Sequence, residues 1–534
     1  MDAVVLSTQD LTTIDQVLDR AAELNGSCEA YVEGVTATQE RRILTFGDWK
    51  RRADALAAHL QNSGVRRNDV VCLLMGPSID YAIANQAVIR CGAVSSGINP
   101  RLGTNEQQSI FERMRPRVTL AEDDLSGALG SVAGEVITRS AARGVPDAVP
   151  DHVDGRTCDD LVAVVWTSGT TGLPKGALFT HSSLRAVSAG TDLLSQPGDR
   201  KLSPLPFAHI GYMTRTWDEL ANGVTTIIAP SPWRASTAME AIINERVTVA
   251  QGVPTQWALM LDLEGYEDAD TSSLRIVSTG AARMAPSQVA ALRTRFGVPV
   301  IVRYTSTESS LGTGTRLDDD DYTVAQTVGR PVAGVSMRLV DPEGSEVAQG
   351  EIGRVALRSA AVMVGYVAPR DHSDAPLHVD AEITDPVRSS DGWITTGDFG
   401  VVNDRGNLSL VGRDNEMYQR GGYNIYPAEV EQALDGAPGV QAVAVVAGSD
   451  DVLGEVGIAF VIADPTGPSP EREVLQAFLA DRLADYKAPD VVIVVKEFPL
   501  TAIGKIDKKS LRVLADQAAQ RRAKDVANSK KKRS

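Results

Sequence analysis

Residues 167–176 read TSGTTGLPKG and follow directly after the apolar run LVAVVW at residues 161–166. β-Branched residues fill the apolar run, so it predicts a buried strand that ends where the glycine- and threonine-rich stretch begins. Glycine lets a backbone turn and approach a ligand closely, and clustered N–H groups, hydroxyls and a lysine attract anions. The stretch therefore predicts a loop that binds a polyphosphate.

This loop differs from a Walker loop, in which Gly-Lys-Ser/Thr stand in succession, because Leu173 and Pro174 separate its last loop glycine from the lysine. The candidate phosphate-binding residues are Thr167, Ser168, Gly169, Thr170, Thr171, Gly172 and Lys175.

Short β-branched runs alternate with helical patterns on both sides of this loop. Strands are predicted at residues 225–229, 247–251, 275–278 and 298–304. Between the last two, residues 286–297 predict a helix that begins near a proline, ends before a glycine and carries Val289, Leu292 and Phe296 on one face. Alternating strands and helices of this kind predict an α/β architecture with stacked, largely parallel sheets.

The pattern changes near residue 412. Two apolar strands are predicted at residues 440–448 and 455–463, and residues 470–486 predict a helix with Leu475, Phe478, Leu479 and Leu483 on one face. The sequence therefore predicts a small α+β domain behind a large α/β domain. The basic residues 514–534 contain few apolar side chains and predict a disordered tail.

The 534-residue chain has a formal net charge of −16, which argues against nucleic-acid binding. It shows neither a secretory leader nor an apolar run of about 20 residues that could span a bilayer, so we expect a cytoplasmic protein without an integral membrane segment. Its four widely spaced cysteines form no zinc-binding pattern. The oligomeric state stays open, a homo-oligomer included.

The loop at residues 167–176 resembles the phosphate loop of the adenylate-forming superfamily, which includes acyl-CoA synthetases, amino-acid adenylation domains and luciferases. Further motifs follow in the family's order over nearly the whole chain. The resemblance implies that ATP and a carboxylic acid react in the presence of bound Mg²⁺ to form an acyl-adenylate. It also implies that coenzyme A then accepts the acyl group.

The motif YTSTE at residues 304–308 follows a predicted strand. The resemblance implies that Tyr304 stacks on adenine, Thr307 contacts the α-phosphate and Glu308 binds Mg²⁺. Thr305 stands where the family usually has glycine, which puts the fine geometry of this segment in question. Residues Gly280, Ala281 and Ala282 resemble the loop that borders adenine and the substrate.

The motif TTGD at residues 395–398 resembles the ribose-binding turn. The resemblance implies that Asp398 binds the ribose hydroxyls and that Arg413 contacts ribose or phosphate. It also implies a hinge at Asn415, and a loop formed by Gly421, Gly422 and Tyr423 that lines the pantetheine tunnel.

Lys505, in PLTAIGKIDKK, resembles the catalytic lysine of the family. A carboxylate that attacks an anionic phosphorus meets like-charge repulsion, and a cation between the two groups offsets it. His209 matches a family position that gates the path of the carboxylate or the thiol. The resemblance thus divides the chain into an adenylating domain (1–411), a hinge (412–415) and a mobile domain that carries the catalytic lysine (416–513).

Several alternatives remain. The acceptor could be the phosphopantetheine of a carrier protein, although no carrier domain follows in this sequence. An amino-acid adenylation domain is disfavoured. Such domains usually have an aspartate near this position that binds the α-amino group, and the residues FAHIG around His209 contain no carboxylate. A luciferase is disfavoured because the sequence lacks a C-terminal S-K-L. A non-catalytic nucleotide sensor is excluded only by an assay. Small residues such as Gly211 suggest room for a bulky apolar acid, and fatty, aryl and alicyclic or steroid-derived acids all stay open.

Overall fold

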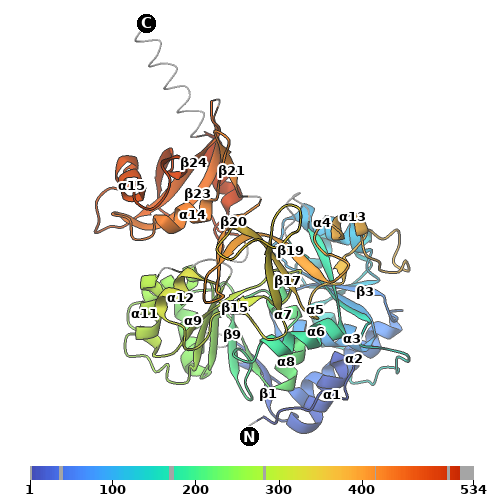
Figure 1. Cartoon of the computed structure of the whole chain (residues 1–534). Coiled ribbons are helices and arrows are strands. Elements are labelled where there is room, and N and C mark those ends of the chain that lie inside the picture. Colours follow the sequence, from blue (N-terminus) through green and yellow to red (C-terminus); the bar gives the residue numbers. More distant parts are fainter. Residues whose placement is uncertain are drawn as a thin grey trace. The chain divides into compact units, whose positions relative to one another are not determined.

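The computed structural model describes residues 3–34, 40–167, 174–280, 284, 286–414, 416–450, 452–501 and 505–517. Its internal contacts divide the chain into two units (Figure 1). The first unit comprises Met1–Met337 and Ala356–Thr395, and the second comprises Arg338–Val355 and Thr396–Ser534. A large N-terminal α/β part and a smaller C-terminal part confirm the predicted fold class.

The first unit contains a seven-stranded sheet that is parallel apart from its β8 pairings. In spatial order its strands are β18 (Gly365–Tyr366), β8 (Lys175–Thr180), β7 (Leu161–Thr167), β4 (Val94–Ile98), β3 (Val70–Leu74), β5 (Val118–Ala121) and β6 (Glu135–Thr138).

The first unit also contains a nine-stranded sheet, parallel except at its two ends. Its order is β15 (Arg330–Pro331), β14 (Thr313–Gly314), β13 (Val300–Tyr304), β12 (Ile276–Gly280), β11 (Val249–Gly252), β9 (Arg200–Ser203), β10 (Thr225–Ile228), β1 (Glu29–Glu33) and β2 (Arg42–Thr45). The four predicted strands of this region are confirmed as β10 to β13, with ends shifted by a few residues.

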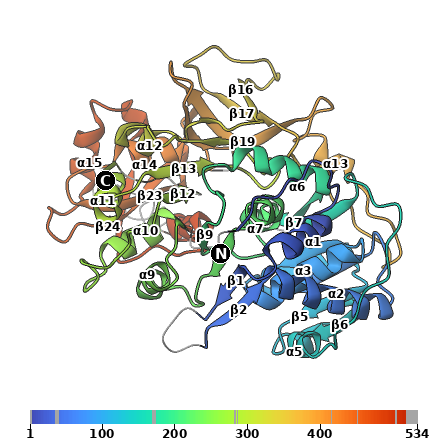
Figure 2. The same ribbon diagram turned by 90° about the horizontal axis from the view of Figure 1, so that it is seen from below.

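Helices cover the sheets of the first unit on both faces. They are α1 (Ile14–Asn25), α2 (Phe46–Asn62), α3 (Ile79–Arg90), α4 (Thr104–Met114), α5 (Arg139–Arg143), α6 (His181–Val187), α7 (Ile210–Met213), α8 (Thr216–Ala221), α9 (Ala235–Asn244), α10 (Pro254–Leu261), α11 (Pro286–Phe296), α12 (Asp321–Gln326) and α13 (Ala381–Thr384). Figure 2 shows α2 packed beside α3, and α5 next to β6. No helix in the described residues is both long and apolar enough to cross a membrane.

One buried cluster joins the two sheets, since Tyr31 and Ile228 of the nine-stranded sheet and Leu73 and Val165 of the seven-stranded sheet belong to it. This shared core confirms that the sheets are stacked. Helices α9 to α12 cover the other face of the nine-stranded sheet. The predicted helix at residues 286–297 is confirmed as α11, whose Val289, Leu292 and Phe296 are buried.

A four-stranded sheet has the order β16 (Ser336–Val340), β17 (Gly353–Arg358), β19 (Trp393–Val402) and β20 (Leu408–Arg413). The remaining strands belong to the second unit and form a further sheet: β21 (Tyr418–Arg420), β22 (Tyr423–Ile425), β23 (Val440–Asp450), β24 (Gly454–Ala463) and β25 (Val491–Val495). The predicted strands at 440–448 and 455–463 are confirmed as β23 and β24.

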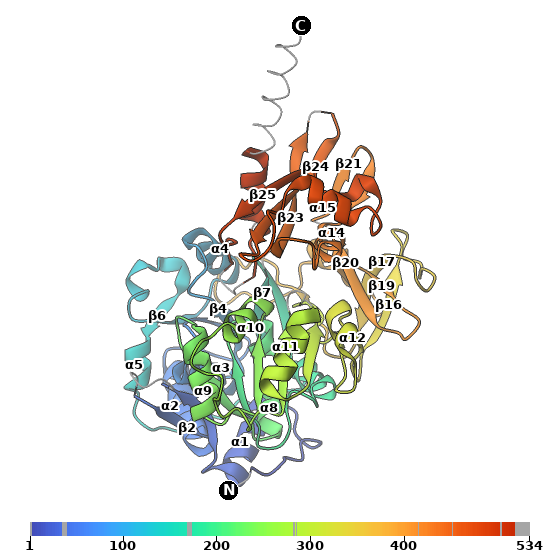
Figure 3. The same ribbon diagram turned by 90° about the vertical axis from the view of Figure 1, so that its left-hand side faces the viewer.

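Helices α14 (Pro427–Ala433) and α15 (Arg472–Leu479) pack on one face of β23 and β24 (Figure 3). Residues 508–517 are helical, and Leu511 and Ala515 cover the other face. The predicted helix at 470–486 was too long: α15 ends at Leu479, where the amide of Arg482 turns back to the Leu479 carbonyl. Leu475 and Leu479 are buried as predicted.

The stretch from Tyr366 to residue 391 begins in a buried strand and then runs along the surface. Tyr366 belongs to β18, and Tyr366, Val367 and Arg370 are buried. The Arg370 guanidinium is satisfied by backbone carbonyls, among them those of Met114 and Ala375, which is why a charged residue is tolerated there.

Leu292 offers a test of the packing of α11. The Leu292→Ala variant should lower the free energy of unfolding by about 2–5 kcal/mol, because it leaves a cavity in a fully buried site. Urea unfolding of the intact chain, followed by circular dichroism, measures the change. Thr294→Ala on the exposed side of the same helix is the control and should stay within about 0.5 kcal/mol. Equal effects of the two variants would contradict this packing.

Candidate active site

The predicted phosphate loop joins two antiparallel neighbours in the seven-stranded sheet. Thr167 ends β7, Lys175 begins β8, and the two residues are register partners. The loop therefore closes a hairpin, whereas a Walker loop leads from a strand into a helix. Ser168, Gly169, Thr170, Thr171 and Gly172 lie outside the described residues, as do Ala281, Ala282 and Asn415.

Glu308, the predicted metal ligand, is held by a tyrosine from another strand. The Tyr366 hydroxyl donates to Glu308 Oε1 at 2.6 Å, and the Met363 amide donates to the Glu308 carbonyl at 2.8 Å. Burial, and next the Glu308 charge, raises the pKa of the Tyr366 hydroxyl, so this group keeps its proton and acts as a donor. Lys175 Nζ lies 5.4 Å from the centre of the Tyr366 ring. Tyr366 thus links the flank of the phosphate loop to Glu308.

Tyr304 and Gly280 lie at the carboxyl ends of two neighbouring parallel strands, β13 and β12. Tyr304 is buried. A Cβ added to Gly280 would stand 2.8 Å from the Arg303 carbonyl oxygen, so this strand end requires glycine. Open α/β sheets bind ligands at such strand ends.

Thr305, the departure from the family pattern, is accommodated without strain in this structure. Its side chain is exposed, and its Oγ1 lies 3.3 Å from Ser309 Oγ. The backbone of Thr305 does not adopt a positive φ. Thr307, two residues further on, is half-buried.

His209 caps the N-terminus of α7, because its Nδ1 accepts a hydrogen bond from the Gly211 amide at 3.2 Å. With Nδ1 as an acceptor, the proton of a neutral ring sits on Nε2. The flanking rings of Phe207 and Tyr212 are stacked with centroids 3.8 Å apart, which anchors this turn in the core. A Cβ on Gly211 would stand 2.6 Å from Leu205 Cδ1, so Gly211 serves tight packing and leaves no free space at its own position.

The second unit brings Asp398 and Arg413 together. They are register partners on β19 and β20, and Arg413 Nε donates to Asp398 Oδ1 at 2.7 Å. The Asp398 amide donates to Thr396 Oγ1 at 3.2 Å, and Thr396 Oγ1 donates to the Val355 carbonyl at 3.0 Å. The Asp398 carboxylate is therefore buried, paired and fixed in orientation.

Lys505 lies in the electrostatic neighbourhood of this pair. The Thr501 amide donates to the Lys505 carbonyl at 2.7 Å and the Lys505 amide donates to Thr501 Oγ1 at 3.2 Å, which closes a tight turn. Burial lowers the pKa of the Lys505 amine, Arg413 lowers it further, and Asp398 and Glu416 oppose both effects. The second unit thus contains a half-buried lysine whose pKa depends on the pair of residues predicted to bind ribose.

Gly421 and Gly422 form the two-residue turn between β21 and β22. Both have positive φ, +58° and +90°, which a two-residue hairpin of this type requires. Tyr423 follows on the exposed side, and its ring stacks on that of Tyr486 at 4.3 Å between centroids.

The sequence analysis missed Tyr366 and Thr396 as supports of Glu308 and Asp398. The apolar run around Tyr366, residues 360–368, was the available signal for a buried strand. No local pattern pointed to its partner, since 58 residues separate Tyr366 from Glu308.

Two family models match most of the chain. The family model described as AMP-binding enzyme matches residues 18–367, and the model of the AMP-binding enzyme C-terminal domain matches residues 429–505.

Among curated proteins, the chain is 32% identical over 533 residues to a 3-[(3aS,4S,7aS)-7a-methyl-1,5-dioxo-octahydro-1H-inden-4-yl]propanoyl:CoA ligase of Mycobacterium tuberculosis, covering 95% of this chain and 99% of that protein. It is 32% identical to an indoleacetate–CoA ligase of Aromatoleum aromaticum, covering 89% and 93%. Among solved structures, the anthranilate CoA ligase AuaEII in complex with anthranoyl-AMP is 25% identical and superimposes with a TM-score of 0.83, covering 96% of this chain and 100% of that chain.

The Arg413→Gln variant should raise the pKa of the Lys505 amine, because it removes a cation and releases Asp398 from its ion pair. The pH dependence of acetylation of Lys505 by trace acetic anhydride, read by peptide mass spectrometry, measures the shift, with exposed Lys509 as the internal reference. Arg512→Gln, which breaks the exposed pair with Glu455, is the matched control and should leave Lys505 unchanged. A shift toward lower pH in Arg413→Gln would refute the coupling.

Proposed function

The chain belongs to the AMP-binding enzyme family, and from this premise we propose that it is an acid–thiol ligase that converts a carboxylic acid and ATP into an acyl-adenylate and then into an acyl-CoA. AMP and pyrophosphate are the other products. The observation that carries the proposal is the half-buried Lys505 in the electrostatic neighbourhood of Asp398 and Arg413, which supplies a cation where the proposed nucleotide site requires one.

In the first half-reaction, a carboxylate oxygen attacks the α-phosphorus of ATP and pyrophosphate leaves. Both reactants are anions, so Lys505 acts by offsetting their repulsion. Burial lowers the pKa of Lys505, and two anions beside its amine would raise that pKa again. The positive charge is thus most stable when both reactants are present, which favours the transition state over the free enzyme.

The remaining proposed contacts divide between the units. In the first unit, the loop from Thr167 to Lys175 binds the phosphates, Tyr304 stacks on adenine and Thr307 contacts the α-phosphate. In the second unit, Asp398 and Arg413 bind the ribose. The hydrogen bonds that hold Asp398 support this assignment. A carboxylate whose orientation is already fixed needs no rearrangement to accept hydrogen bonds from two hydroxyls.

Magnesium fits the proposed site through one protein ligand. Glu308 is a carboxylate held by Tyr366, and the described residues contain no group of three or more His, Cys, Asp or Glu side chains that could hold a metal ion by themselves. A single carboxylate together with phosphate oxygens and water suits Mg²⁺, which prefers oxygen ligands and retains water. When bound, the ion would neutralise phosphate charge.

For the second half-reaction, we propose that residues 416–513 turn about Asn415 relative to residues 1–411. This movement would withdraw Lys505 and bring Gly421, Gly422 and Tyr423 to the thiol path. The hairpin turn and the exposed Tyr423 support such a role, because they offer a stiff loop with an accessible aromatic face. His209 would border the same path, where its capping bond fixes the ring.

We propose a carboxylic acid whose carboxylate is attached to a ring system, directly or through a short side chain, as the substrate class. The support comes from the similar proteins, which are named for an octahydroindenyl propanoyl, an indoleacetate and an anthranilate group. We further propose a cytoplasmic location, where ATP and coenzyme A are both available.

The direct test is pyrophosphate release from ATP and Mg²⁺ with a panel of aryl, alicyclic and fatty acids, each with and without coenzyme A. Acid-dependent release and a mass-detected acyl-CoA, strongest for ring-bearing acids, are expected. Acyl-AMP that forms but does not react with coenzyme A would redirect the proposal to a carrier-protein acceptor. Complete inactivity over the panel would contradict the ligase function.

The Lys505→Ala variant separates the two half-reactions. Adenylation should fall on the order of 100- to 1000-fold, while thiolysis of supplied acyl-AMP should change far less, because Lys505 acts only in the first step. Pyrophosphate release and coenzyme A consumption measure the two rates. Lys509→Ala, an exposed lysine four residues away, is the control. Equal losses in both steps would exclude the assigned role.

A further inference from the structure

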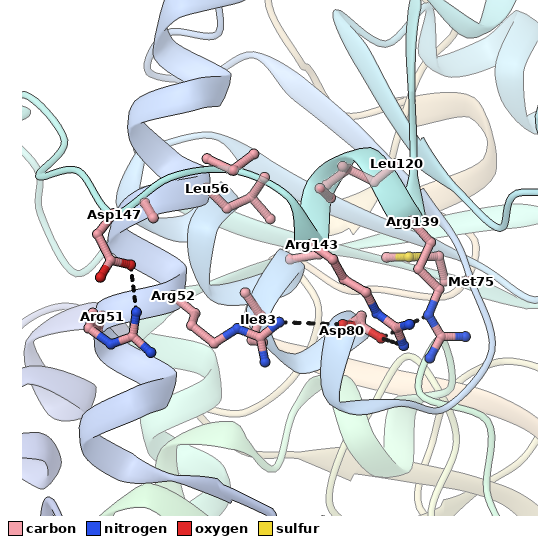
Figure 4. A pocket seen from close by; sticks show the side chains of 14 residues that line it. Arg51, Arg52, Leu56, Met75, Asp80, Ile83, Leu120, Arg139, Arg143 and Asp147 are labelled. Carbon is pink, nitrogen blue, oxygen red and sulfur yellow. Dashed lines mark hydrogen bonds and ion pairs between the residues drawn. The ribbon is translucent and has the colours of Figure 1, made fainter. Parts of the chain in front are cut away.

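A second pocket lies away from the proposed reaction site, at the carboxyl ends of β3, β5 and β6. Met75 follows β3 directly, Leu120 belongs to β5, and Arg139 follows β6. Helices α2, α3 and α5 supply the other walls (Figure 4). The pocket has a volume of about 120 Å³.

The topology of the sheet favours a ligand at this position. β3 connects through α3 to β4 on one side, and β4 connects through α4 to β5 on the other side of β3. The strand order therefore reverses between β3 and β5, and the crevice at the carboxyl ends of such strands is where open α/β sheets bind ligands. The proposed phosphate loop follows a different strand, β7.

Arginines dominate the mouth of the pocket. Figure 4 shows Arg52 from α2 and Arg139 and Arg143 from α5 pointing toward one carboxylate, Asp80. Arg139 Nε donates to Asp80 Oδ2 at 2.8 Å and Arg143 Nη2 donates to the same oxygen at 2.5 Å. Arg52 stands 3.8 Å and Arg42 3.9 Å from Asp80 Oδ1. One buried carboxylate therefore faces four guanidinium groups.

The other acidic groups nearby are also paired with arginines, two of them with members of this set of four. Glu122 and Glu33 lie 3.1 Å and 3.7 Å from Arg139, and Glu33 also pairs with Arg42. Asp48 and Asp147 pair with Arg51, and both are more than half exposed, so solvent screens them.

Arg52 is the cation that remains without a hydrogen-bond acceptor among the described residues, its nearest carboxylate oxygen being that of Asp80 at 3.8 Å. Burial lowers the pKa of Arg52, and Arg42, Arg143 and Arg51 lower it further against the opposing charge of Asp80. Guanidinium groups carry several donors that match carboxylate and phosphate oxygens in pairs. The Arg52 side chain is 29% exposed, so an anion would replace water at those donors and relieve the repulsion.

The floor of the pocket is apolar. Leu56, Met75, Ile83, Leu120 and Ala142 line it beneath the arginines. Leu56, Met75, Ile83 and Leu120 are already buried and Ala142 is half-buried, so a short hydrocarbon group on the anion would gain its contact mainly at Ala142.

We propose that this pocket binds a small oxyanion that carries a short apolar group, a phosphate monoester or a carboxylate, with the oxyanion on Arg52 and Arg143 and the apolar group against Ala142 and Leu120. This site is independent of the proposed ligase function. The chemical class of its ligand follows from the arginines at the opening, from the apolar side chains behind them, and from a volume that admits only a small molecule.

The test is residue-resolved labelling of arginines with phenylglyoxal in the full chain, because ligands in the nucleotide site would not protect Arg143. Propyl phosphate and butyrate are the probes, inorganic phosphate and propanol the comparisons. We expect saturable protection of Arg143 by at least one probe, at lower concentration than inorganic phosphate requires. Arg246, which is largely exposed, should stay unprotected.

The Arg52→Gln variant should raise the half-protection concentration on the order of tenfold to a hundredfold, the range for a lost charge-assisted hydrogen bond. Arg52→Lys, which keeps the charge, should retain more of the binding, and Arg246→Gln should match the parent. Ala142→Leu should remove the advantage of propyl phosphate over inorganic phosphate. Absence of saturable protection in the parent, or equal protection in Arg52→Gln and the parent, would overturn the proposal.

Discussion

Two groups of like charge must meet in the proposed reaction, a substrate carboxylate and the α-phosphate of ATP. Coulomb repulsion between them is weak in water and strong in a water-excluded site, so the same desolvation that organises the reactants also raises the cost of their approach. The chain provides cations whose charged form is destabilised by burial. Lys505 is the clearest case, because burial and Arg413 lower its pKa. In the proposed reaction, the two anionic reactants would stabilise the positive charge of Lys505.

The supporting residues follow from the same constraint. A buried carboxylate such as Asp398 needs a fixed partner, and Arg413 provides one across a strand pair. Glu308 needs a donor that stays protonated beside a negative charge, and the buried Tyr366 hydroxyl fulfils this condition. Each supporting group comes from a strand, so its position is set by sheet hydrogen bonds and not by a loop.

Charge and burial act differently around Asp80. There a single carboxylate faces four guanidinium groups, and one of them, Arg52, has no hydrogen bond to a described residue. An arrangement of this kind is unfavourable for the empty protein, because like charges repel. It becomes favourable when an anion enters, which is the physical reason to regard the Asp80 cluster as more than a structural ion network.

By itself, the sequence determined the features that depend on neighbours along the chain: the strand β7 with its glycine-rich end, the buried face of α11, the strands β23 and β24, and the family to which the motifs belong. Side-chain periodicity and turn chemistry are local, so they can be read directly. Only the tertiary structure decided which distant residues meet: Tyr366 with Glu308, Lys505 with Asp398 and Arg413, and Arg52 with Asp80 and Arg143. It also showed that His209 caps a helix and that Gly211 is filled by Leu205. These contacts depend on how strands pair and helices pack over long sequence separations, and no local pattern encodes that pairing.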